Sequence, residues 1–260
     1  MADELKEKQE RLRGFFADHS RLALAFSGGV DSAWLFYEAC RRGADVGAFF
    51  VKTAFQPDFE LADAQRLAQE LGRELTVVEL DIFSCPEAAA NGPRRCYFCK
   101  QAILTALRTE AGRQGFDLLC DGSNASDEAA DRPGMQACQE LQVVSPLREC
   151  GLTKADIRQL SREAGLFTWD KPSYSCLATR VATNQPLTRY LLRRIEEGES
   201  ILRELGFSDF RLRVRDDAAL LQVTAGQMER AGAAWPQIER RLLPLFAQVS
   251  LDEQARKESL

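Results

Sequence analysis

Residues 25–32, with the sequence AFSGGVDS, combine two glycines, two serines and one aspartate between a predicted strand and a predicted helix. Two adjacent glycines let the main chain approach an anion closely, and the amides and dipole of a helix start favour negative charge there. The GxxxxGK[ST] loop of nucleoside triphosphatases requires a lysine that this stretch lacks. The pattern therefore predicts a phosphate-binding loop of another kind. The alternative is a glycine turn that simply joins the strand to the helix.

A second polar stretch, residues 121–135, follows another predicted strand and has the sequence DGSNASDEAADRPGM. Gly122, Ser123 and Asn124 come first, and several carboxylates follow. Ligands of α/β sheets bind at the carboxyl ends of strands, so this stretch predicts a seat for a ribose and a metal ion. The alternative is a polar loop without a ligand.

Cys96 and Cys99 form a CxxC pair at a predicted helix start. The two arginines before the pair and the lysine after it are cations of the kind that favour the thiolate form. Such a pair can be a redox dithiol, half of a zinc site or part of an iron–sulfur site. A zinc site would require a second CxxC or histidines, and the chain has a single histidine and no second CxxC.

Cys176 lies in the segment WDKPSYSCLATR, residues 169–180, which has no apolar period to explain its burial. Two cysteines on one element and one distant cysteine suit a [4Fe–4S] cluster with three protein ligands and one open iron. The alternative for Cys176 is a small buried residue. Cys85 is a candidate for a fourth ligand. The remaining cysteines are predicted to be packing residues: Cys40, Cys120, Cys138 and Cys150.

Residues 210–215 have the sequence FRLRVR, in which arginines alternate with apolar residues. A strand would place all three guanidiniums on one face, where they suit bidentate recognition of phosphate and carboxylate groups. The alternative is the solvated face of an edge strand. Glu196 and Glu199, on a predicted long helix, are further candidates for metal ligands.

The composition limits the class of protein. A chain of 260 residues forms one large domain, or one large and one small domain. With 34 basic and 39 acidic residues, a net charge of −5 argues against binding to nucleic acid phosphates. The one histidine, His19, lies in a charged N-terminal segment, which argues strongly against a Ser-His-Asp triad, a Cys-His dyad or a multi-histidine metal site. Without an apolar leader or a membrane-length apolar run, we expect a protein of the reducing cytoplasm and no membrane partner.

The elements that must position these residues alternate along the chain. Short apolar runs predict strands at 21–26, 45–53, 74–80 and 117–123. Helical periods lie at 3–19, 32–43, 57–72 and 99–115. This alternation predicts a parallel α/β sheet with right-handed crossovers. The loops after its strands, at 27–32, 53–58, 81–99 and 121–134, should then open at one edge.

The C-terminal part has a different pattern. A long helix is predicted at 187–206, two extended runs around Asp216 and Asp217 in 210–224, and mostly helix in 225–248. We expect a domain boundary near 165–185. The predicted domains are 1–175, which carries the phosphate loop, and 176–260, for substrate binding or oligomerisation.

The loop at 25–32 closely resembles the SGGxDS loop of the PP-loop ATP pyrophosphatases. The motifs PRRCYFCK, DGSN…RPG, SPLREC-GLTKADIR and WDKPSYSCLATR also occur in the order and spacing of the LarE family, over nearly the whole chain. The resemblance implies a parallel sheet of the adenine-nucleotide alpha-hydrolase (HUP-like) type with a smaller C-terminal α+β domain.

That family inserts sulfur at the expense of ATP. Its members make the pyridinium dithiocarboxylate mononucleotide of the nickel-pincer cofactor, which lactate racemase uses. The resemblance implies adenylation of a carboxylate of pyridinium-3,5-biscarboxylic acid mononucleotide, with release of pyrophosphate, followed by conversion to a thiocarboxylate with release of AMP. ATP, this small molecule and a sulfide donor are the implied partners, and we expect a homo-oligomer.

The resemblance also implies roles for individual residues. Cys176 aligns with a cysteine that some members sacrifice as sulfur donor, becoming dehydroalanine, whereas members that also carry the CxxC are thought to bind a [4Fe–4S] cluster. Asp31 is expected to be catalytic, by holding the loop or Mg²⁺. The other expected contacts are Ser27, Gly28, Gly29, Ser32, Gly122 and Asn124 for ATP, Arg211, Arg213 and Arg180 for the substrate, and Cys96, Cys99 and Cys176 for the cluster.

The chain departs from the family pattern at residues 219–222. Where the family often reads ARIE, this chain reads ALLQ, so a charge pair is absent. No metal or substrate role is carried over to these positions.

Three other functions remain open. A PP-loop tRNA thiolase uses similar chemistry on a macromolecule, but the acidic balance and the lack of zinc ribbons or a basic extension count against it. An amidotransferase-like ligase would not need three cysteines near the site. A nucleotide-binding iron–sulfur sensor would bind ATP and a cluster without releasing pyrophosphate.

Overall fold

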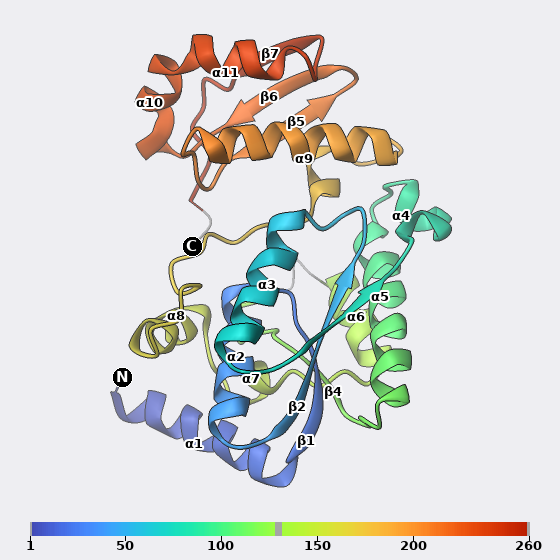
Figure 1. The fold of residues 1–260 in the computed structure, drawn as a ribbon, viewed down its shortest axis with the longest axis vertical. Helices are drawn as coiled ribbons and strands as arrows, with labels where there is room; N and C mark the ends of the chain where they lie inside the picture. Colours follow the sequence, from blue (N-terminus) through green and yellow to red (C-terminus); the bar gives the residue numbers. More distant parts are fainter. Residues whose placement is uncertain (1, 128–131, 259–260) are drawn as a thin grey trace. The chain divides into compact units, whose positions relative to one another are not determined.

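The computed structural model describes residues 2–127 and 132–258, which fold into two compact units (Figure 1). The first unit comprises Met1–Thr53, Asp58–Cys85 and Cys96–Lys171. The second comprises Ala54–Pro57, Pro86–Arg95 and Pro172–Leu260. The expected domains, 1–175 and 176–260, are continuous pieces of chain, whereas the second unit also takes in two short segments from the N-terminal part. Among the described residues, no helix is both long and apolar enough to cross a membrane.

The described part of the first unit is built on a four-stranded sheet in the order β3–β2–β1–β4, in which every neighbouring pair is parallel. Its strands are β1 (Arg21–Ala25), β2 (Asp45–Lys52), β3 (Leu75–Glu79) and β4 (Leu119–Asp121). The predicted parallel α/β class is therefore confirmed. The chain builds outward from β1 through β2 to β3 and then returns to the other side of β1. This reversal of strand order marks the place where open α/β sheets bind ligands.

Helices cover both faces of this sheet. Alternate residues of a strand point to opposite faces, and in β1 the side chains of Leu22 and Leu24 pack against α1, α2 and α3, whereas Ala23 packs against α5 and α6. The helices of this unit are α1 (Ala2–Asp18), α2 (Val30–Arg41), α3 (Asp58–Glu70), α5 (Arg95–Arg113), α6 (Arg132–Glu140), α7 (Pro146–Glu149) and α8 (Lys154–Glu163), with a short 3-10 turn η1 (Ile82–Ser84).

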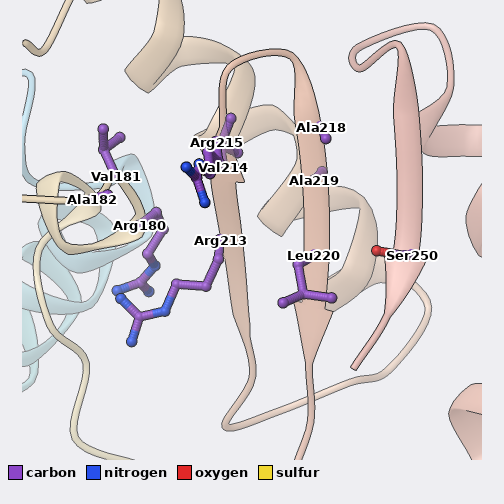
Figure 2. Close-up of a pocket in the computed structure, with 10 residues that line it drawn as sticks. All are labelled: Arg180, Val181, Ala182, Arg213, Val214, Arg215, Ala218, Ala219, Leu220 and Ser250. Atoms are coloured by element: carbon purple, nitrogen blue, oxygen red, sulfur yellow. The ribbon is translucent and has the colours of Figure 1, made fainter. Parts of the chain in front are cut away.

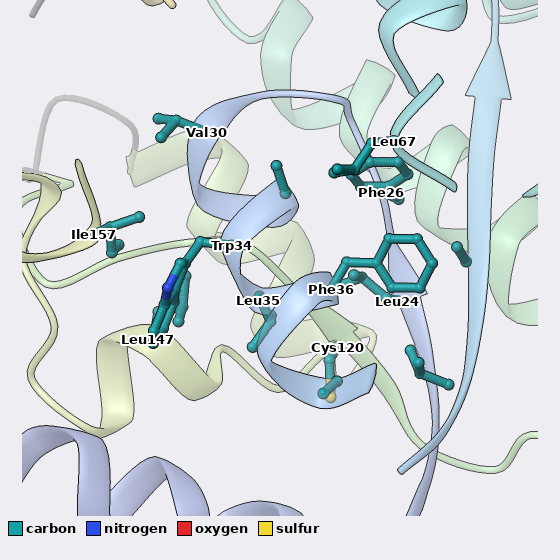
Figure 3. Packing of buried hydrophobic residues seen from close by; sticks show 14 of the residues in the cluster. Leu24, Phe26, Val30, Trp34, Leu35, Phe36, Leu67, Cys120, Leu147 and Ile157 are labelled. Carbon is teal, nitrogen blue, oxygen red and sulfur yellow. The ribbon is translucent and has the colours of Figure 1, made fainter. Parts of the chain in front are cut away.

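Helix α2 is buried along most of its length. Figure 3 shows Phe36 directed toward Leu24 of β1 and Trp34 directed toward Leu147 of α7. The rings of Phe26 and Phe36 lie 5.2 Å apart between their centroids. A helix that is buried at most of its positions is held by the core rather than by its own propensity. The start of α2 is therefore fixed relative to the end of β1.

Helices α6, α7 and α8 were not predicted from sequence as helices. Two of them carry start signals that are clear in the structure: Pro146 begins α7, and Thr153 with Asp156 forms a capping box at α8. Helix α7, with four residues, is too short to show a helical period, whereas α8 buries Ile157, Leu160 and Ser161 at helical spacing, a signal that was present in the sequence.

Two glycines allow close approaches around the start of α2. Gly28 has φ +72°, and a Cβ there would lie 2.9 Å from the carbonyl oxygen of Glu60. A Cβ on Gly122, just after β4, would lie 2.8 Å from the backbone nitrogen of Ser32. The ends of β1 and β4 therefore meet at the first turn of α2, as the sequence predicted for the loops at 27–32 and 121–134.

The described part of the second unit contains a three-stranded sheet in the order β5–β6–β7. Strands β5 (Arg211–Arg215) and β6 (Ala218–Gln222) form an antiparallel hairpin around Asp216 and Asp217, and β7 (Gln248–Leu251) pairs with β6 in parallel. Strand β7 was missed because it is four residues long. The helical elements are α4 (Pro86–Ala89), η3 (Leu177–Arg180), α9 (Arg189–Glu204), η4 (Ala225–Gln227), α10 (Met228–Ala233) and α11 (Trp235–Leu242).

We predict that Gly122→Ala lowers the free energy of unfolding by about 1–3 kcal/mol, because the added methyl group must displace the backbone of α2. Gly112→Ala is the matched control: its Cβ would meet no atom within 4 Å, so stability should be unchanged or raised by up to about 1 kcal/mol. Urea denaturation of both variants measures the difference. Equal effects of the two substitutions would contradict the close approach of β4 to α2.

Candidate functional site

Hydrogen bonds of its own serines stabilise the loop between β1 and α2. The hydroxyl oxygens of Ser27 and Ser32 lie 3.1 Å apart, and Ser32 donates to the carbonyl of Gly29 at 3.2 Å. Gly29 caps α2 without a side-chain hydrogen bond from the described residues, so the first amides of the helix are not capped by a side chain. A helix start of this kind binds phosphate. The structure thus brings together four residues that the sequence assigned to ATP: Ser27, Gly28, Gly29 and Ser32.

Asp31, in the first turn of α2, supplies the carboxylate of the loop. One carboxylate oxygen accepts a hydrogen bond from the ammonium of Lys154, whereas the other, Oδ1, is buried and has no hydrogen-bond partner among the described residues. Burial raises the pKa of Asp31, and the positive charge of Lys154 opposes that rise. A buried carboxylate oxygen without a partner is costly. Mg²⁺ prefers such oxygen ligands together with phosphates, so Asp31 fits the predicted magnesium role.

Two lysines that were not predicted from the sequence as site residues contact this loop. Lys154 begins α8 and reaches Asp31. The ammonium of Lys171 donates to the carbonyl of Gly28 at 3.1 Å and to Asp63 at 2.6 Å. Lys154 lies in the motif GLTKADIR and Lys171 in the motif WDKPSYSC, both of which carry the family resemblance. A lysine within such a motif was the sequence signal that could have identified each as a site residue.

The end of β4 supports the loop from the other side. Asp121 is buried and accepts hydrogen bonds from the hydroxyls of Ser123 and Ser145, both at 2.7 Å. Asn124 is completely buried, and its side chain is bonded to Asp127 and to the amide of Ser126. In this arrangement Asn124 shapes the loop, and its contact with ATP stays a prediction. The predicted carboxylates Glu128 and Asp131 lie outside the described residues.

The three predicted cluster cysteines are divided between the two units. Cys96 and Cys99 lie in the first turn of α5, where residues three apart share one side of a helix. Cys96 is exposed and Cys99 half-buried. Cys176 is half-buried at the start of η3 in the second unit. Within residues 2–127 and 132–258, no group of three His, Cys, Asp or Glu residues is arranged to hold a metal ion. As donors, three accessible thiols are nevertheless the type of ligand that an iron–sulfur cluster requires.

Most of the remaining cysteines are packing residues, as predicted. Cys120, Cys138 and Cys150 are buried, while Cys40 is half-buried and packs against the core. Burial raises the pKa of the Cys138 thiol to about 11, and it raises the pKa of Cys120, Cys150 and Cys40 as well. Thiols that stay protonated are poor metal ligands.

Arginines hold the main chain on both sides of Cys176. Arg211 donates to the carbonyl of Ser173 at 2.8 Å, Arg180 to the carbonyl of Ser175 at 2.8 Å, and Arg213 to the carbonyl of Thr179. All three of these arginines were predicted to bind substrate. Arg180 and Arg211 are almost completely buried, whereas Arg213 is exposed. Arg180 thus contacts the main chain beside Cys176 as well as Glu199.

A pocket of about 370 Å³ in the second unit adjoins Arg213 (Figure 2). Although the residue is exposed, partial desolvation lowers the pKa of Arg213, and the nearby charges of Arg180 and Arg256 lower it further. Arg180 is paired with Glu199, and Arg256 is paired with Asp209. The exposed guanidinium of Arg213 is therefore the group of the three that offers donors to an anion in the pocket. The pocket is lined by Arg180, Val181, Ala182, Arg213, Val214, Arg215, Ala218, Ala219, Leu220 and Ser250.

Gln222, at the end of the ALLQ departure, is a neutral bridge in this region. Its carbonyl oxygen accepts a hydrogen bond from Arg213 at 3.1 Å, and its amide donates to Asp252 at 2.7 Å. Glu199 was predicted as a candidate metal ligand. Its carboxylate oxygens accept hydrogen bonds from Arg180 and Tyr174.

Comparison with known proteins adds sequence evidence. The family model described as Thiamine biosynthesis protein (ThiI) matches residues 17–203. The pyridinium-3,5-bisthiocarboxylic acid mononucleotide synthase of Lactiplantibacillus plantarum is 30% identical over 251 residues, 95% of this chain and 91% of the relative. An uncharacterized protein of Synechocystis is 35% identical over 229 residues, 87% of this chain and 85% of the relative. The tRNA-specific 2-thiouridylase MnmA of Thermotoga maritima is 26% identical over 193 residues, 58% of this chain and 54% of the relative.

We predict that Asp31→Asn gains stability relative to the unmodified protein as the pH rises from 4 to 7. Because burial raises the folded-state pKa of Asp31 above its ordinary value of 3.8, the folded chain binds this proton more tightly than the unfolded chain does. The unmodified protein therefore loses unfolding free energy as this carboxyl ionises, and the asparagine variant does not. Urea denaturation at several pH values measures the difference.

Asp156→Asn is a control of opposite sign. Burial alone would raise the pKa of Asp156, but hydrogen bonds from Thr153 and Lys8 hold it below its ordinary value. The stability that Asp156 contributes is present above the unfolded pKa, so this variant should lose stability as the pH rises over the same range. If the unfolding free energies of the two variants, relative to the unmodified protein, changed in the same direction with pH, the raised pKa of Asp31 would be disproved.

Proposed function

The chain belongs to the LarE family of PP-loop, ATP-dependent sulfurtransferases, and we propose that it converts a carboxylate of pyridinium-3,5-biscarboxylic acid mononucleotide to a thiocarboxylate for the nickel-pincer cofactor. The observation that carries this proposal is the phosphate loop with half-buried Asp31, one oxygen of which is buried without a hydrogen-bond partner among the described residues. We further expect the protein to act as a homo-oligomer in the cytoplasm, with a sulfide donor as partner.

The first unit would carry out activation. A carboxylate oxygen of the substrate attacks the α-phosphorus of ATP, the bond from that phosphorus to the bridging oxygen breaks, and pyrophosphate leaves with the bonding electrons. The amides and hydroxyls of residues 27–32 would bind the pyrophosphate, and the ammonium of Lys154 would offset its charge. Mg²⁺ held by Asp31 would neutralise further charge on the phosphates.

The second step replaces AMP by sulfur. Sulfide attacks the carbonyl carbon of the adenylate, the carbon–oxygen bond to AMP breaks, and AMP leaves with the electron pair. When bound by Cys96, Cys99 and Cys176, a [4Fe–4S] cluster would supply this sulfide. The alternative is that the Cys176 thiolate displaces AMP to form a thioester. Loss of the Cα proton of Cys176 then breaks its Cβ–S bond, which releases the thiocarboxylate and leaves dehydroalanine. Neither route requires a histidine base.

The pocket beside Arg213 supports a substrate with anionic groups. Arg213 is exposed at the pocket, and its charge lies near those of Arg180 and Arg256. Phosphate and carboxylate groups, both present on the pyridinium mononucleotide, fit guanidinium donors. Arg211 stays a predicted substrate contact.

A tRNA thiolase is the second candidate. The similarity to a tRNA-specific 2-thiouridylase covers 58% of this chain, whereas the similarity to the pyridinium mononucleotide synthase covers 95%. The acidic composition also gives no support to an RNA substrate. These observations favour the small molecule.

We predict that Asp31→Asn and Gly29→Ala each lower substrate-dependent pyrophosphate release by about 100-fold or more, since each alters the loop that would bind the departing pyrophosphate. Gly29→Ala should leave the fold unchanged, because the nearest atom to its Cβ would be Ser27 Oγ, at an ordinary contact distance of 3.4 Å. Its effect on the rate would therefore come from a methyl group placed where the phosphates bind. A coupled pyrophosphate assay measures the rate. Asp117→Asn, at an exposed position before β4, is the control and should be fully active. Undiminished release in both loop variants would refute the ATP site.

A second test concerns the source of sulfur. After anaerobic reconstitution with iron and sulfide, the protein should show charge-transfer absorbance and form more than one thiocarboxylate per chain. Alanine at Cys96, Cys99 or Cys176 should remove both properties, because each thiolate would be a ligand. Visible spectroscopy and product mass spectrometry measure them.

Cys40→Ala is the control for that test, since Cys40 packs against the core, and it should keep both properties. Cys85→Ala tests the possible fourth ligand. The opposing result is Cys176 converted to dehydroalanine once per chain, with the Cys96 and Cys99 variants still active. That result would retain the sulfurtransferase and remove the cluster.

A further inference from the structure

We propose that Arg180, Glu199 and Tyr174 are positioning residues, which hold the loop around Cys176 in one conformation for sulfur transfer. We call this loop, residues 173–180, the cysteine loop. The inference rests on the proposed role of Cys176. It extends the proposed function because the family resemblance assigned Arg180 to the substrate and left Tyr174 without a role.

The centre of this arrangement is the carboxylate of Glu199, on α9. The residue is 0% exposed, yet each of its oxygens has several donors. One oxygen accepts from Arg180 Nε at 2.6 Å and from the amide of Leu212 at 3.2 Å. The other accepts from the hydroxyl of Tyr174 at 2.6 Å and from Arg180 at 3.2 Å. Helix α9 and strand β5 are thereby joined to both ends of the cysteine loop.

Arg180 connects that carboxylate to the main chain beside Cys176. Its third nitrogen, Nη1, donates to the carbonyl of Ser175 at 2.8 Å and to the hydroxyl of Thr179 at 2.8 Å. Thr179 in turn donates its hydroxyl to the carbonyl of Cys176, also at 2.8 Å. The guanidinium also lies over the ring of Tyr174, 4.4 Å from its centroid. The groups on either side of Cys176 are thus fixed through one planar side chain.

The cysteine loop needs such support because it is not part of a helix or strand before Leu177. Main-chain groups in a half-buried loop must find partners, and here arginine side chains supply them. A lysine could not replace Arg180, since its ammonium lacks the planar fork that reaches a carboxylate and a carbonyl together.

Stability alone does not account for a completely buried Arg180–Glu199 pair. Removing two charges from water costs about as much as their attraction returns, so an apolar pair of similar volume would serve the core equally well. What the ion pair adds is direction: fixed donor and acceptor angles that define where the cysteine loop lies. A reactive group gains from such preorganisation, since a displacement of about 1 Å can cost about 100-fold in rate.

The test compares two conservative variants with matched controls. Tyr174→Phe removes one hydroxyl, and Glu199→Gln removes the charge while keeping the shape. Tyr190→Phe and Glu204→Gln make the same changes at exposed positions of α9, the helix that carries Glu199. We expect single-turnover pyrophosphate release within about 2-fold of the unmodified protein in all four variants. Thiocarboxylate formation should fall by about 10- to 100-fold in the first two variants and remain unchanged in the controls.

A second readout does not depend on activity or on a bound cluster. In the unloaded protein, the alkylation rate of Cys176 by iodoacetamide, followed by peptide mass spectrometry, reports how the loop presents the thiol. We expect a rate change of at least about 3-fold in Tyr174→Phe and Glu199→Gln relative to the control variants. If Glu199→Gln fails to fold, Tyr174→Phe still decides, because it leaves the ion pair in place.

The outcomes are distinct. If Tyr174→Phe and Glu199→Gln lowered pyrophosphate release as much as thiocarboxylate formation, Arg180, Glu199 and Tyr174 would have only a structural role. That result would overturn the proposal. An unchanged alkylation rate in Tyr174→Phe would also overturn it. Failure of the unmodified protein to form any thiocarboxylate would instead count against the proposed function, and the alkylation rate would then decide the positioning role alone.

Discussion

Helix α2 is apolar over consecutive positions, and the core encloses it between the sheet and helices α7 and α8. Burial of Trp34 and Phe36 fixes the axis of the helix, and the close approach of Gly122 fixes its first turn against β4. The phosphate loop has little freedom as a result, because its two ends are set by β1 and α2. The amides that would face phosphate are thus positioned by hydrophobic packing behind them, at no cost in ordering when the ligand binds.

Two carboxylates show opposite uses of burial. The oxygens of Glu199 are saturated by donors from the same unit, so this carboxylate is a fixed joint within the protein. Asp31 keeps one buried oxygen without a protein partner among the described residues and has a raised pKa. A protein retains an unsatisfied buried group where a ligand completes it, and the neighbouring phosphate loop supplies the reason. The difference in hydrogen bonding thereby separates a binding group from a supporting one.

The arginines of β5 illustrate how one side chain serves two purposes. Alternation in the strand would place all three guanidiniums on one face, but Arg211 turns back to hold the main chain of the second unit, and Arg213 both holds Thr179 and lines the pocket. The neutral side chain of Gln222 accepts a hydrogen bond from Arg213. A neutral partner leaves the guanidinium charge less compensated than a carboxylate would, which favours an anionic ligand at the pocket.

The sequence alone determined the parallel α/β class, the phosphate loop and the family, because these depend on local signals: alternation of apolar runs, glycines at a strand end and motifs in fixed order. It also identified the buried cysteines from their apolar neighbours. Lys154 and Lys171 could not be assigned, since each meets the loop across more than one hundred residues of chain. Strand β7, with four residues, was too short to show a period. That Arg180 faces Glu199 and the carbonyl of Ser175, rather than solvent, was decided by tertiary packing, because a one-dimensional pattern specifies which side of an element a residue lies on and not which groups meet it there.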